Sequence, residues 1–398
     1  NLDQSTTATG PAFLLFGCGL LLGFLVLSDV LKYVSPNAYM TSLLLTGALV
    51  FVLLPFNSSV GLLYTAFFIL GVIFSSIECT CLLMLRNLNV DKAAMYLAFT
   101  GTFFGIGFLV IPLAMVMSGG NIFVEYIFVA MEFAVIGLYL HLDKESCDKL
   151  CGSVRRIHNL NVMKAPKHFR VEVLSSLILF SLVGGQICAG TYLAAYIDLY
   201  AAGTESNRVV YDYHTDFMLF TSFTSFSKFF VPFLQASYPT LKKQMKIMHV
   251  SNFLAVIGAS LYLLDPQKSN SSFVIFLISN GIFTGGTAGV IYAVNGMLTD
   301  VTYSSTMIMM FGVFLGMSFY PYIFSLLVEN DVVSLINLFP ASIFFSMTVT
   351  LLLSSAMTYL AYDRKQPYQS TDQLNLIGGR GGGGSDDDNE IEDGTSVA

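Results

Sequence analysis

Long apolar segments separated by short polar connections make up most of this chain. Eleven such segments, roughly 18 to 28 residues long, are bounded by charged residues, proline or glycine. These lengths suit helices that cross a bilayer, whereas barrel strands need only about 9–11 residues and alternate strictly. Because backbone polar groups in hydrocarbon need internal partners, the pattern predicts an all-α polytopic membrane protein. The predicted spans cover residues 13–31, 39–56, 61–85, 94–117, 122–140, 173–201, 217–234, 248–264, 273–298, 305–328 and 336–362.

The composition agrees with a bilayer as the solvent. The 398 residues are 55% hydrophobic and 11% charged, with a mean hydropathy of +0.69. A soluble domain carries about 25% charged residues. Much of the net charge of −7 lies in one tail, which reads GGRGGGGSDDDNEIEDGTSVA and is predicted to be disordered. No basic patch points to a nucleic-acid partner.

The positive charges predict an orientation. If the first segment runs from the outer face inwards, sixteen Lys and Arg residues fall in inner connections and the tail, against Arg208 and Lys268 outside. The sequons at Asn57 and Asn270 then both lie outside, where they would be glycosylated. We therefore expect a protein of the secretory route, in the plasma membrane or an endolysosomal membrane.

The two halves of the chain are alike. FFILGVIFSS (67–76) is similar to FLISNGIFTGG (276–286), and SDVLKYVSPNAYM is similar to LQASYPTLKKQM. In this alignment span 13–31 pairs with 217–234, and nothing pairs with 173–201, so the first half is expected to lack its first helix. The predicted parts are a five-span bundle (1–142), a basic cytosolic linker (143–170), a six-span bundle (171–362) and an acidic tail (363–398).

Two six-helix halves joined by a long basic inner connection resemble the major facilitator superfamily. Within it, SDVLKYVSPNAYMTSLLLTGALVFVLLPF is similar to the region around helices two and three of the branch of sodium-dependent glucose transporters and fucose permeases. ILGVIFSSIECTCLLMLRN resembles its fourth helix, and GGQICAGTYLAAY its seventh. The resemblance implies a monomeric secondary transporter of a small polar solute, most simply a sugar, which works by alternating access with sodium or a proton as the possible coupling ion.

Departures from the branch leave the solute open. Asp29 and Lys32 stand in the loop between helices two and three, but its other basic residues are missing. Glu78-Cys79-Thr80-Cys81 stands where the branch has an aspartate, small residues and an asparagine. The chain also has no tryptophan, a favoured platform for sugar rings. A proton-coupled anion carrier would use the same scaffold.

Glu78, Lys228, Glu125 and Glu132 lie inside predicted spans, where a charge costs at least about 2.5–3.5 kcal/mol near the bilayer centre. Glu78 would bind substrate or a cation, carry a proton, or form a structural bond to a neighbouring helix. Lys228 would bind an anion or pair with an acid across the cavity, or extend to the interface. Glu125 and Glu132 share one helix face, and Glu132 is expected to form a structural pairing.

Uncharged polar residues complete the candidate binding site. Gln186 and Tyr192 lie on span 173–201, and Asn280 and Asn295 on the glycine-rich span 273–298. Amides and tyrosines suit a hydroxyl-rich ligand. The alternative is hydrogen bonding between helices, which contributes less than about 2 kcal/mol each.

No motif predicts an enzyme or a bound cofactor. The chain has no P-loop, H-E-x-x-H or G-x-S-x-G sequence, and its five histidines do not form a metal-binding pattern. Cys147 and Cys151 are expected to be reduced cytosolic thiols, with palmitoylation or metal binding as alternatives. The alternative to transport is a transporter-like receptor or scaffold, which the acidic tail and the missing helix would suit.

Overall fold

The computed structural model describes residues 9–56, 59–88, 121–143, 169–202, 213–237, 240–265, 269–298, 303–329 and 334–363, and single positions between 106 and 118. Most of the predicted span 94–117 lies outside the described residues. So do the linker with Cys147 and Cys151, the sequon residue Asn57 and the acidic tail.

Long helices make up the described part of the chain. Eight of them are long and apolar enough to cross a membrane. Helices α8 and α10 lie where two further spans are predicted. The chain is therefore an all-α, multi-pass membrane protein, as the sequence predicts. The helices are α1 (Thr9–Tyr33), α2 (Pro36–Leu53) with the short η2 (Leu54–Phe56), α3 (Val60–Leu88), α5 (Ile122–Leu142), α7 (Phe169–Ala202), α8 (Tyr213–Ser237), α9 (Leu241–Leu264), α10 (Asn270–Leu298), α11 (Tyr303–Glu329) and α12 (Leu335–Asp363).

Local sequence explains where two of these helices begin. The Ser35 hydroxyl accepts a hydrogen bond from the backbone N–H of Ala38 at 3.3 Å, and Pro36 takes the first helical position of α2. Asn121 caps α5 in the same way, with 3.1 Å between its side-chain oxygen and the backbone nitrogen of Phe123. Both caps satisfy backbone donors that a helix start leaves open.

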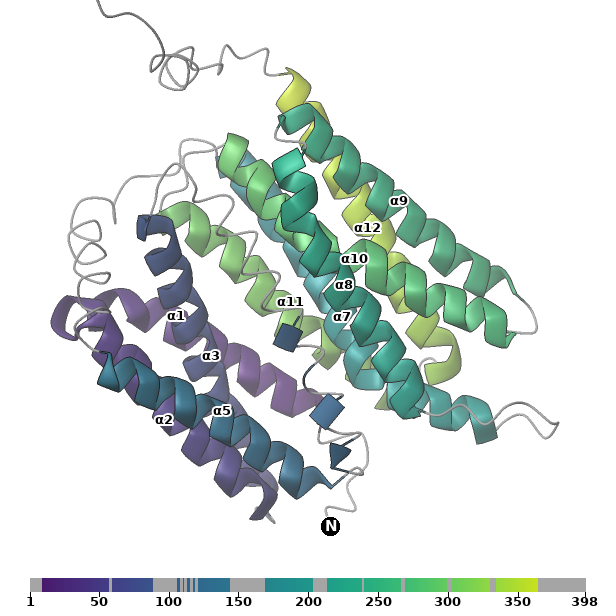
Figure 1. Cartoon of the computed structure of the whole chain (residues 1–398). Coiled ribbons are helices and arrows are strands. Elements are labelled where there is room, and N and C mark those ends of the chain that lie inside the picture. The colour runs from purple at the N-terminus through teal and green to yellow at the C-terminus, as the bar shows by residue number, and fades with distance from the viewer. Residues whose placement is uncertain are drawn as a thin grey trace, which may run out of the picture.

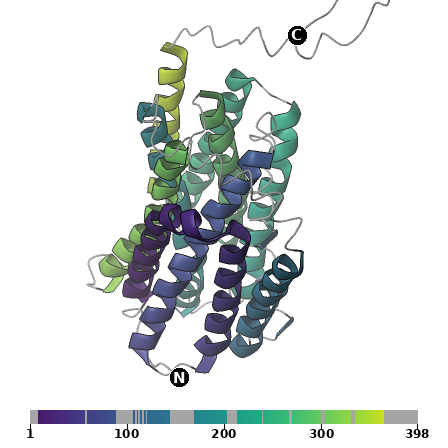
Figure 2. The same ribbon diagram turned by 90° about the vertical axis from the view of Figure 1, so that its left-hand side faces the viewer.

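The helices from the two parts of the chain lie on different sides of the molecule. Helices α1, α2, α3 and α5 pack together on one side, and α7 to α12 pack together on the other (Figure 1). The view turned by 90° shows the helices side by side with their axes in roughly one direction (Figure 2). The main contact between the two sides is that of α1 with α11.

Small residues bring α1 and α11 together. Gly17 packs against the side chain of Ser318. A methyl group added at Gly10 would come within 2.6 Å of the Ser325 Oγ. Because residue numbers rise along α1 as they fall along α11, the two helices are antiparallel. Small residues let membrane helices approach closely, so this seam is typical of packing in lipid.

A second glycine seam joins α7 to α11. Gly312 packs on the backbone of Ser176, and Gly316 packs on the backbone of Phe180 with 2.6 Å to its oxygen from an added methyl. Both pairs are 136 residues apart, so α7 and α11 are parallel and in register. Helix α7 is thus antiparallel to α1.

Helices α2 and α5 form an antiparallel pair. The amide of Asn37 donates a hydrogen bond to the carbonyl of Leu140 at 3.2 Å, and Gly47 packs against the ring of Phe133. Near the other end, the rings of Phe56 and Phe123 lie 5.4 Å apart. The start of α2 therefore lies at the end of α5, and the end of α2 lies at the start of α5.

These directions place the chain segments at two ends of the molecule. Helix α1 runs into α2 with almost no connection, so α1 and α5 end at the same end, and α7 begins there because it is antiparallel to α1. We call this the linker end, since residues 143–168 connect α5 to α7 there. Phe56, which ends η2, and Val60, which begins α3, lie at the opposite end.

Candidate functional site

The buried apolar side chains form two clusters at different heights. The first, the methionine-rich cluster, lies toward the linker end and joins the two sides of the molecule, because α1 and α3 contribute to it as well as α7 to α12. Five of its 22 buried members are methionines and two are phenylalanines. They are Leu20, Phe24, Leu27, Leu31, Cys79, Leu82, Val171, Ile178, Leu179, Leu182, Val183, Val231, Met245, Met248, Val290, Ile291, Val294, Met309, Met310, Val313, Phe314 and Met357.

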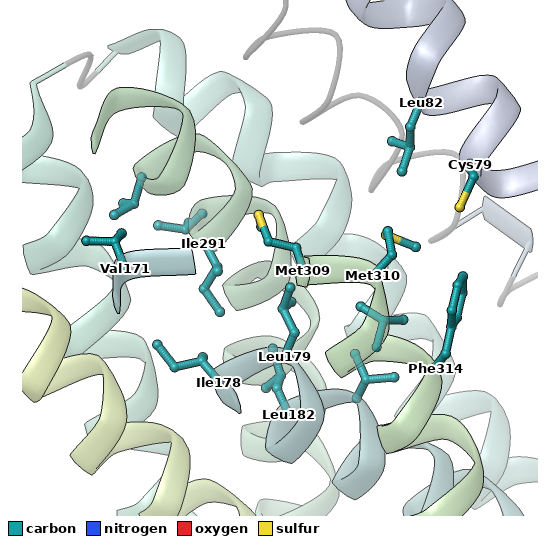
Figure 3. Close-up of a cluster of buried hydrophobic side chains, with 14 of the residues drawn as sticks. Cys79, Leu82, Val171, Ile178, Leu179, Leu182, Ile291, Met309, Met310 and Phe314 are labelled. Atoms are coloured by element: carbon teal, nitrogen blue, oxygen red, sulfur yellow. The ribbon is translucent and has the colours of Figure 1, made fainter. Parts of the chain in front are cut away.

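Figure 3 shows how the two sides meet in this cluster. Cys79 and Leu82 reach in from α3, toward Met310 and Phe314 of α11. Phe314 also meets Phe24 of α1 edge to face, with 5.8 Å between ring centroids. The cluster thus closes the contact between the two sides near the linker end.

The second cluster, the aromatic cluster, lies toward the opposite end and belongs to α7 to α12 alone among the described residues. Eight of its 18 members are aromatic. The hydroxyls of Tyr196 and Tyr262 are hydrogen-bonded, and Tyr196 stacks on Phe339 with 4.7 Å between centroids. The members are Cys188, Ala189, Tyr192, Leu193, Tyr196, Ile197, Phe220, Ala255, Ala259, Tyr262, Phe273, Phe276, Leu277, Phe324, Leu335, Phe339, Ile343 and Met347.

A layer of buried polar side chains separates the two clusters. On each of helices α7 to α11, the sequence passes from one cluster to the other through at least one buried polar residue. We call this set the polar layer. Buried polar groups in hydrocarbon require partners or a ligand, so a layer of them near mid-membrane marks a candidate binding site. The layer comprises Gln186, Thr224, Ser225, Lys228, Asn252, Asn280, Thr287 and Ser318.

Gln186 is the member best placed to meet a ligand. Its side chain is buried, and its amide nitrogen has no hydrogen-bond partner among the described residues. Gly190, one turn further along α7, faces open space, since an added methyl there would have no atom within 4 Å. Residues four apart share a helix face, so Gln186 lies on the side of α7 that borders this space.

Glu78 lies on the other side of the molecule, at the border of the methionine-rich cluster. Its side chain is half-buried and precedes Cys79, the first cluster member on α3. Its carboxyl is within electrostatic range of the Tyr292 hydroxyl on α10. Tyr292 in turn reaches the Met310 sulfur at 3.5 Å. Glu78 therefore lies near helices of the C-terminal part of the chain.

Lys228 is buried on the side of α8 that packs on α10. It follows Thr224 by four residues and precedes Val231 by three, and these neighbours pack against Gly285 and Gly289. Close by, the Ser227 hydroxyl donates to the carbonyl of Ile282. Lys228 thus lies at the α8–α10 contact, within the polar layer.

Other predicted site residues make contacts between helices. The Asn295 amide donates to the Ser175 hydroxyl at 3.0 Å, which joins α10 to α7. The Tyr192 hydroxyl donates to the Pro321 carbonyl at 3.1 Å, and its ring lies 4.3 Å from that of Phe324. Both residues belong to the interior of the C-terminal helices. Asn280 is also buried there, in the polar layer.

Sequence reasoning missed several buried polar residues. The Thr287 hydroxyl donates to Asn252 at 3.2 Å, and the Asn252 amide nitrogen has no partner among the described residues. Glu172 is 1% exposed in the first turn of α7. A lone asparagine inside the apolar segment 248–264 is the signal that would have found Asn252.

The two acids of α5, Glu125 in its first turn and Glu132 at its middle, have different surroundings. Glu125 accepts a hydrogen bond from the Ser118 hydroxyl at 3.3 Å. Glu132 is exposed and has no hydrogen-bond or ion-pair partner among the described residues. The predicted pairing of Glu132 within the chain is therefore not found in the part of the molecule that is described.

The buried amides and hydroxyls of the site can form hydrogen bonds with a polar ligand. Among the described residues, no group of three His, Cys, Asp or Glu could hold a metal ion, and Cys18, Cys79, Cys81 and Cys188 are free thiols. No protein-family model matches the chain, and no curated protein matches its sequence. The arrangement of the described helices is thus the basis for assigning a function.

Proposed function

We propose that this protein is a secondary transporter of a small polar solute, most simply a sugar, with the major facilitator arrangement of two related helical bundles. The solute binds at mid-membrane between α3 and the C-terminal helices. Gln186 contacts it in the polar layer, which also holds Lys228 and Asn280, and Glu78 lies on the route from this site toward the linker end, at the border of the methionine-rich cluster. Asn295 and Tyr192 hold the surrounding helices in place.

The observation that carries this proposal is the order of layers through the membrane. The methionine-rich cluster closes the contact between the two sides at the linker end. The polar layer follows at mid-height, and the aromatic cluster, at the opposite end, belongs to one side alone. This order is expected of a transporter that is closed at the linker end. A polar site at the bilayer midplane between two helical bundles is how many secondary transporters bind their substrates.

Repeated packing supports two related bundles. The contacts of α1 with α3, α2 with α5 and α2 with α3 correspond to those of α8 with α10, α9 with α12 and α9 with α10. Gly71 packs on the Phe16 carbonyl, and Gly281 packs on the Phe220 carbonyl. The sequence alignment that pairs residues 13 and 217 also pairs Phe16 with Phe220. The same glycine contact therefore recurs in both halves.

The helix directions support the predicted orientation. The two ends of the basic linker, and the end of α12 that leads to the tail, lie at the linker end. The end of η2 and the start of α3, which flank Asn57 in the sequence, lie at the opposite end, as does the start of α10 with Asn270, next to the aromatic cluster. With the linker in the cytosol, both sequons would face outwards, and the methionine-rich cluster would be the inner gate.

Uptake into proteoliposomes tests the proposal. Labelled hexoses, polyols and organic acids would be offered with no gradient, a sodium gradient or a proton gradient. Glu78→Gln is expected to lower uptake of the accepted solute about tenfold or more, because losing a bond to a charged group costs about 1.5–3 kcal/mol. Glu132→Gln is the matched control, since it makes the same change at a lipid-facing acid and should leave uptake unchanged.

Two outcomes would contradict the proposal. Uptake of no solute class by well-folded protein under any gradient would favour the receptor or scaffold alternative. If the wild type, Glu78→Gln and Gln186→Leu took up the solute equally, the protein would still be a transporter, but its binding site would be elsewhere.

A further inference from the structure

Glu132 lies at the centre of a membrane-spanning helix. Helix α5 runs from Ile122 to Leu142, so Glu132 is ten residues from either end. At 1.5 Å per residue this is about 15 Å, which is the middle of a hydrocarbon core about 30 Å thick. A carboxyl at this depth has no water with which to bond.

The side chain also points away from the rest of the chain. The opposite side of α5 packs on α2 through Phe133 and Gly137, which meet Gly47 and Leu44. Glu132 is exposed and has no partner among the described residues, whereas Glu125 on the same helix is bonded to Ser118. Nothing in the described fold therefore offsets the cost of this carboxyl.

Large apolar side chains continue the same side of the helix. Phe128 and Ile136 are one turn away on either side, and Val135 and Tyr139 lie three and seven residues further on. Their exposed fractions are 38%, 50%, 65% and 62%. We call these four residues and Glu132 the Glu132 face. Its spacing of three and four residues forms a stripe as long as one helix–helix contact.

We propose that the Glu132 face is the docking surface for a single membrane-spanning helix of another protein, which carries a basic side chain near the bilayer centre. Intramembrane charges are rare, and they normally pair with one another. A basic residue at the same depth would neutralise both charges, and the apolar stripe would pack along the partner helix. A second copy of this chain would instead bring two carboxyls together, which disfavours self-association through this face.

Binding of defined helices to the full chain in nanodiscs tests the proposal. The probe is a labelled polyleucine helix with one central arginine, compared with the same helix carrying leucine there. Energy transfer from the labelled protein would report binding as a function of peptide-to-lipid ratio. We expect the arginine helix to bind at least about tenfold more tightly, which corresponds to 1.4 kcal/mol.

Variants separate docking on this face from general attraction. Glu132→Leu should abolish the preference for the arginine helix, and Glu125→Gln should keep it. Gel filtration of each variant checks that it is folded. The proposal fails if both helices bind equally, if Glu132→Leu keeps the preference, or if cross-linking through a cysteine at Val135 captures a second copy of the chain instead.

Discussion

The methionine-rich cluster and the aromatic cluster differ in composition and in the helices that contribute to them. The first joins α1 and α3 to the C-terminal helices and contains five methionines among 22 buried residues. The second lies within α7 to α12 and contains eight aromatic residues among 18. Methionine is flexible and adapts to irregular contacts, whereas stacked aromatic rings hold a fixed geometry. The difference suits a contact that must separate and reform at one end and a rigid unit at the other.

Hydrogen bonds strengthen the same contrast. In the C-terminal helices, the Ser181 hydroxyl donates to the Ser346 carbonyl at 2.9 Å, and the Ser346 hydroxyl donates back to the Ser181 carbonyl at 2.5 Å. Such reciprocal bonds fix α7 to α12. At the contact between α1 and α11, glycines of α1 pack on serines of α11 and one pair of rings meets edge to face.

The largest effect is expected from Phe339→Ala in the aromatic cluster. Phe339 is fully buried and touches Tyr196 and Phe276. Its truncation should destabilise the protein by about 3–5 kcal/mol, as for buried phenylalanines elsewhere. Thermal unfolding in nanodiscs measures this loss. Phe345→Ala on the same helix is the control, since Phe345 is 62% exposed and should cost little; an equal loss at both sites would refute a special role for the aromatic cluster.

Met310→Ala should affect the proposed inner gate, which is the methionine-rich cluster, more than it affects the fold. The expected loss of stability is about 2 kcal/mol, at the low end for such truncations, because neighbouring methionines can repack. The gate is read by labelling single-cysteine variants that keep either Cys79 or Cys188, which are both buried but lie in different clusters. Met310→Ala should raise the maleimide labelling rate of Cys79 several-fold and leave that of Cys188 unchanged. Equal acceleration at both cysteines would mean general loosening.

Tyr262→Phe should have the smallest effect. It removes the hydroxyl bonded to Tyr196 but keeps the ring that stacks on Phe276. The loss should be about 0.5–1.5 kcal/mol, the net contribution of one hydrogen bond. Chemical unfolding compares it with Tyr359→Phe, whose ring is 71% exposed and whose loss should be near zero. If Tyr262→Phe lowered the free energy of unfolding as much as Phe339→Ala, this hydrogen bond rather than ring packing would be the main source of the cluster's stability.

The sequence predicts the helices well because each is a local property. A run of apolar residues must bury its own backbone bonds in lipid, whatever its neighbours are. Eight predicted spans coincide with apolar helices. Helix α7 begins four residues before its predicted span, so that its first turn contains the buried Glu172. The sequence does not predict this longer helix, because a charged residue at the end of an apolar segment is read as the boundary of the span.

The sequence does not tell which polar side chains line a site and which join helices, because partners far apart in sequence decide what each of them does. Asn295 bonds to Ser175, 120 residues away, and Tyr192 bonds to Pro321. Nothing in their local spacing distinguishes these structural amides and hydroxyls from Gln186, whose nitrogen has no partner among the described residues. For Glu132, helical spacing predicts which residues share its side of the helix. It does not predict that this side is exposed.

Distances between spin labels test the central claim most directly. The first pair of labels replaces Tyr33 on α1 and Lys246 on α9, across the methionine-rich cluster. The second pair replaces Leu261 on α9 and Phe345 on α12, beside the aromatic cluster. All four side chains are exposed. On addition of a transported solute, the first distance should change by about 5 Å or more, the scale of known switching movements, and the second should stay constant. A fixed first distance, or equal changes in both, would contradict a transporter that opens at its methionine-rich cluster.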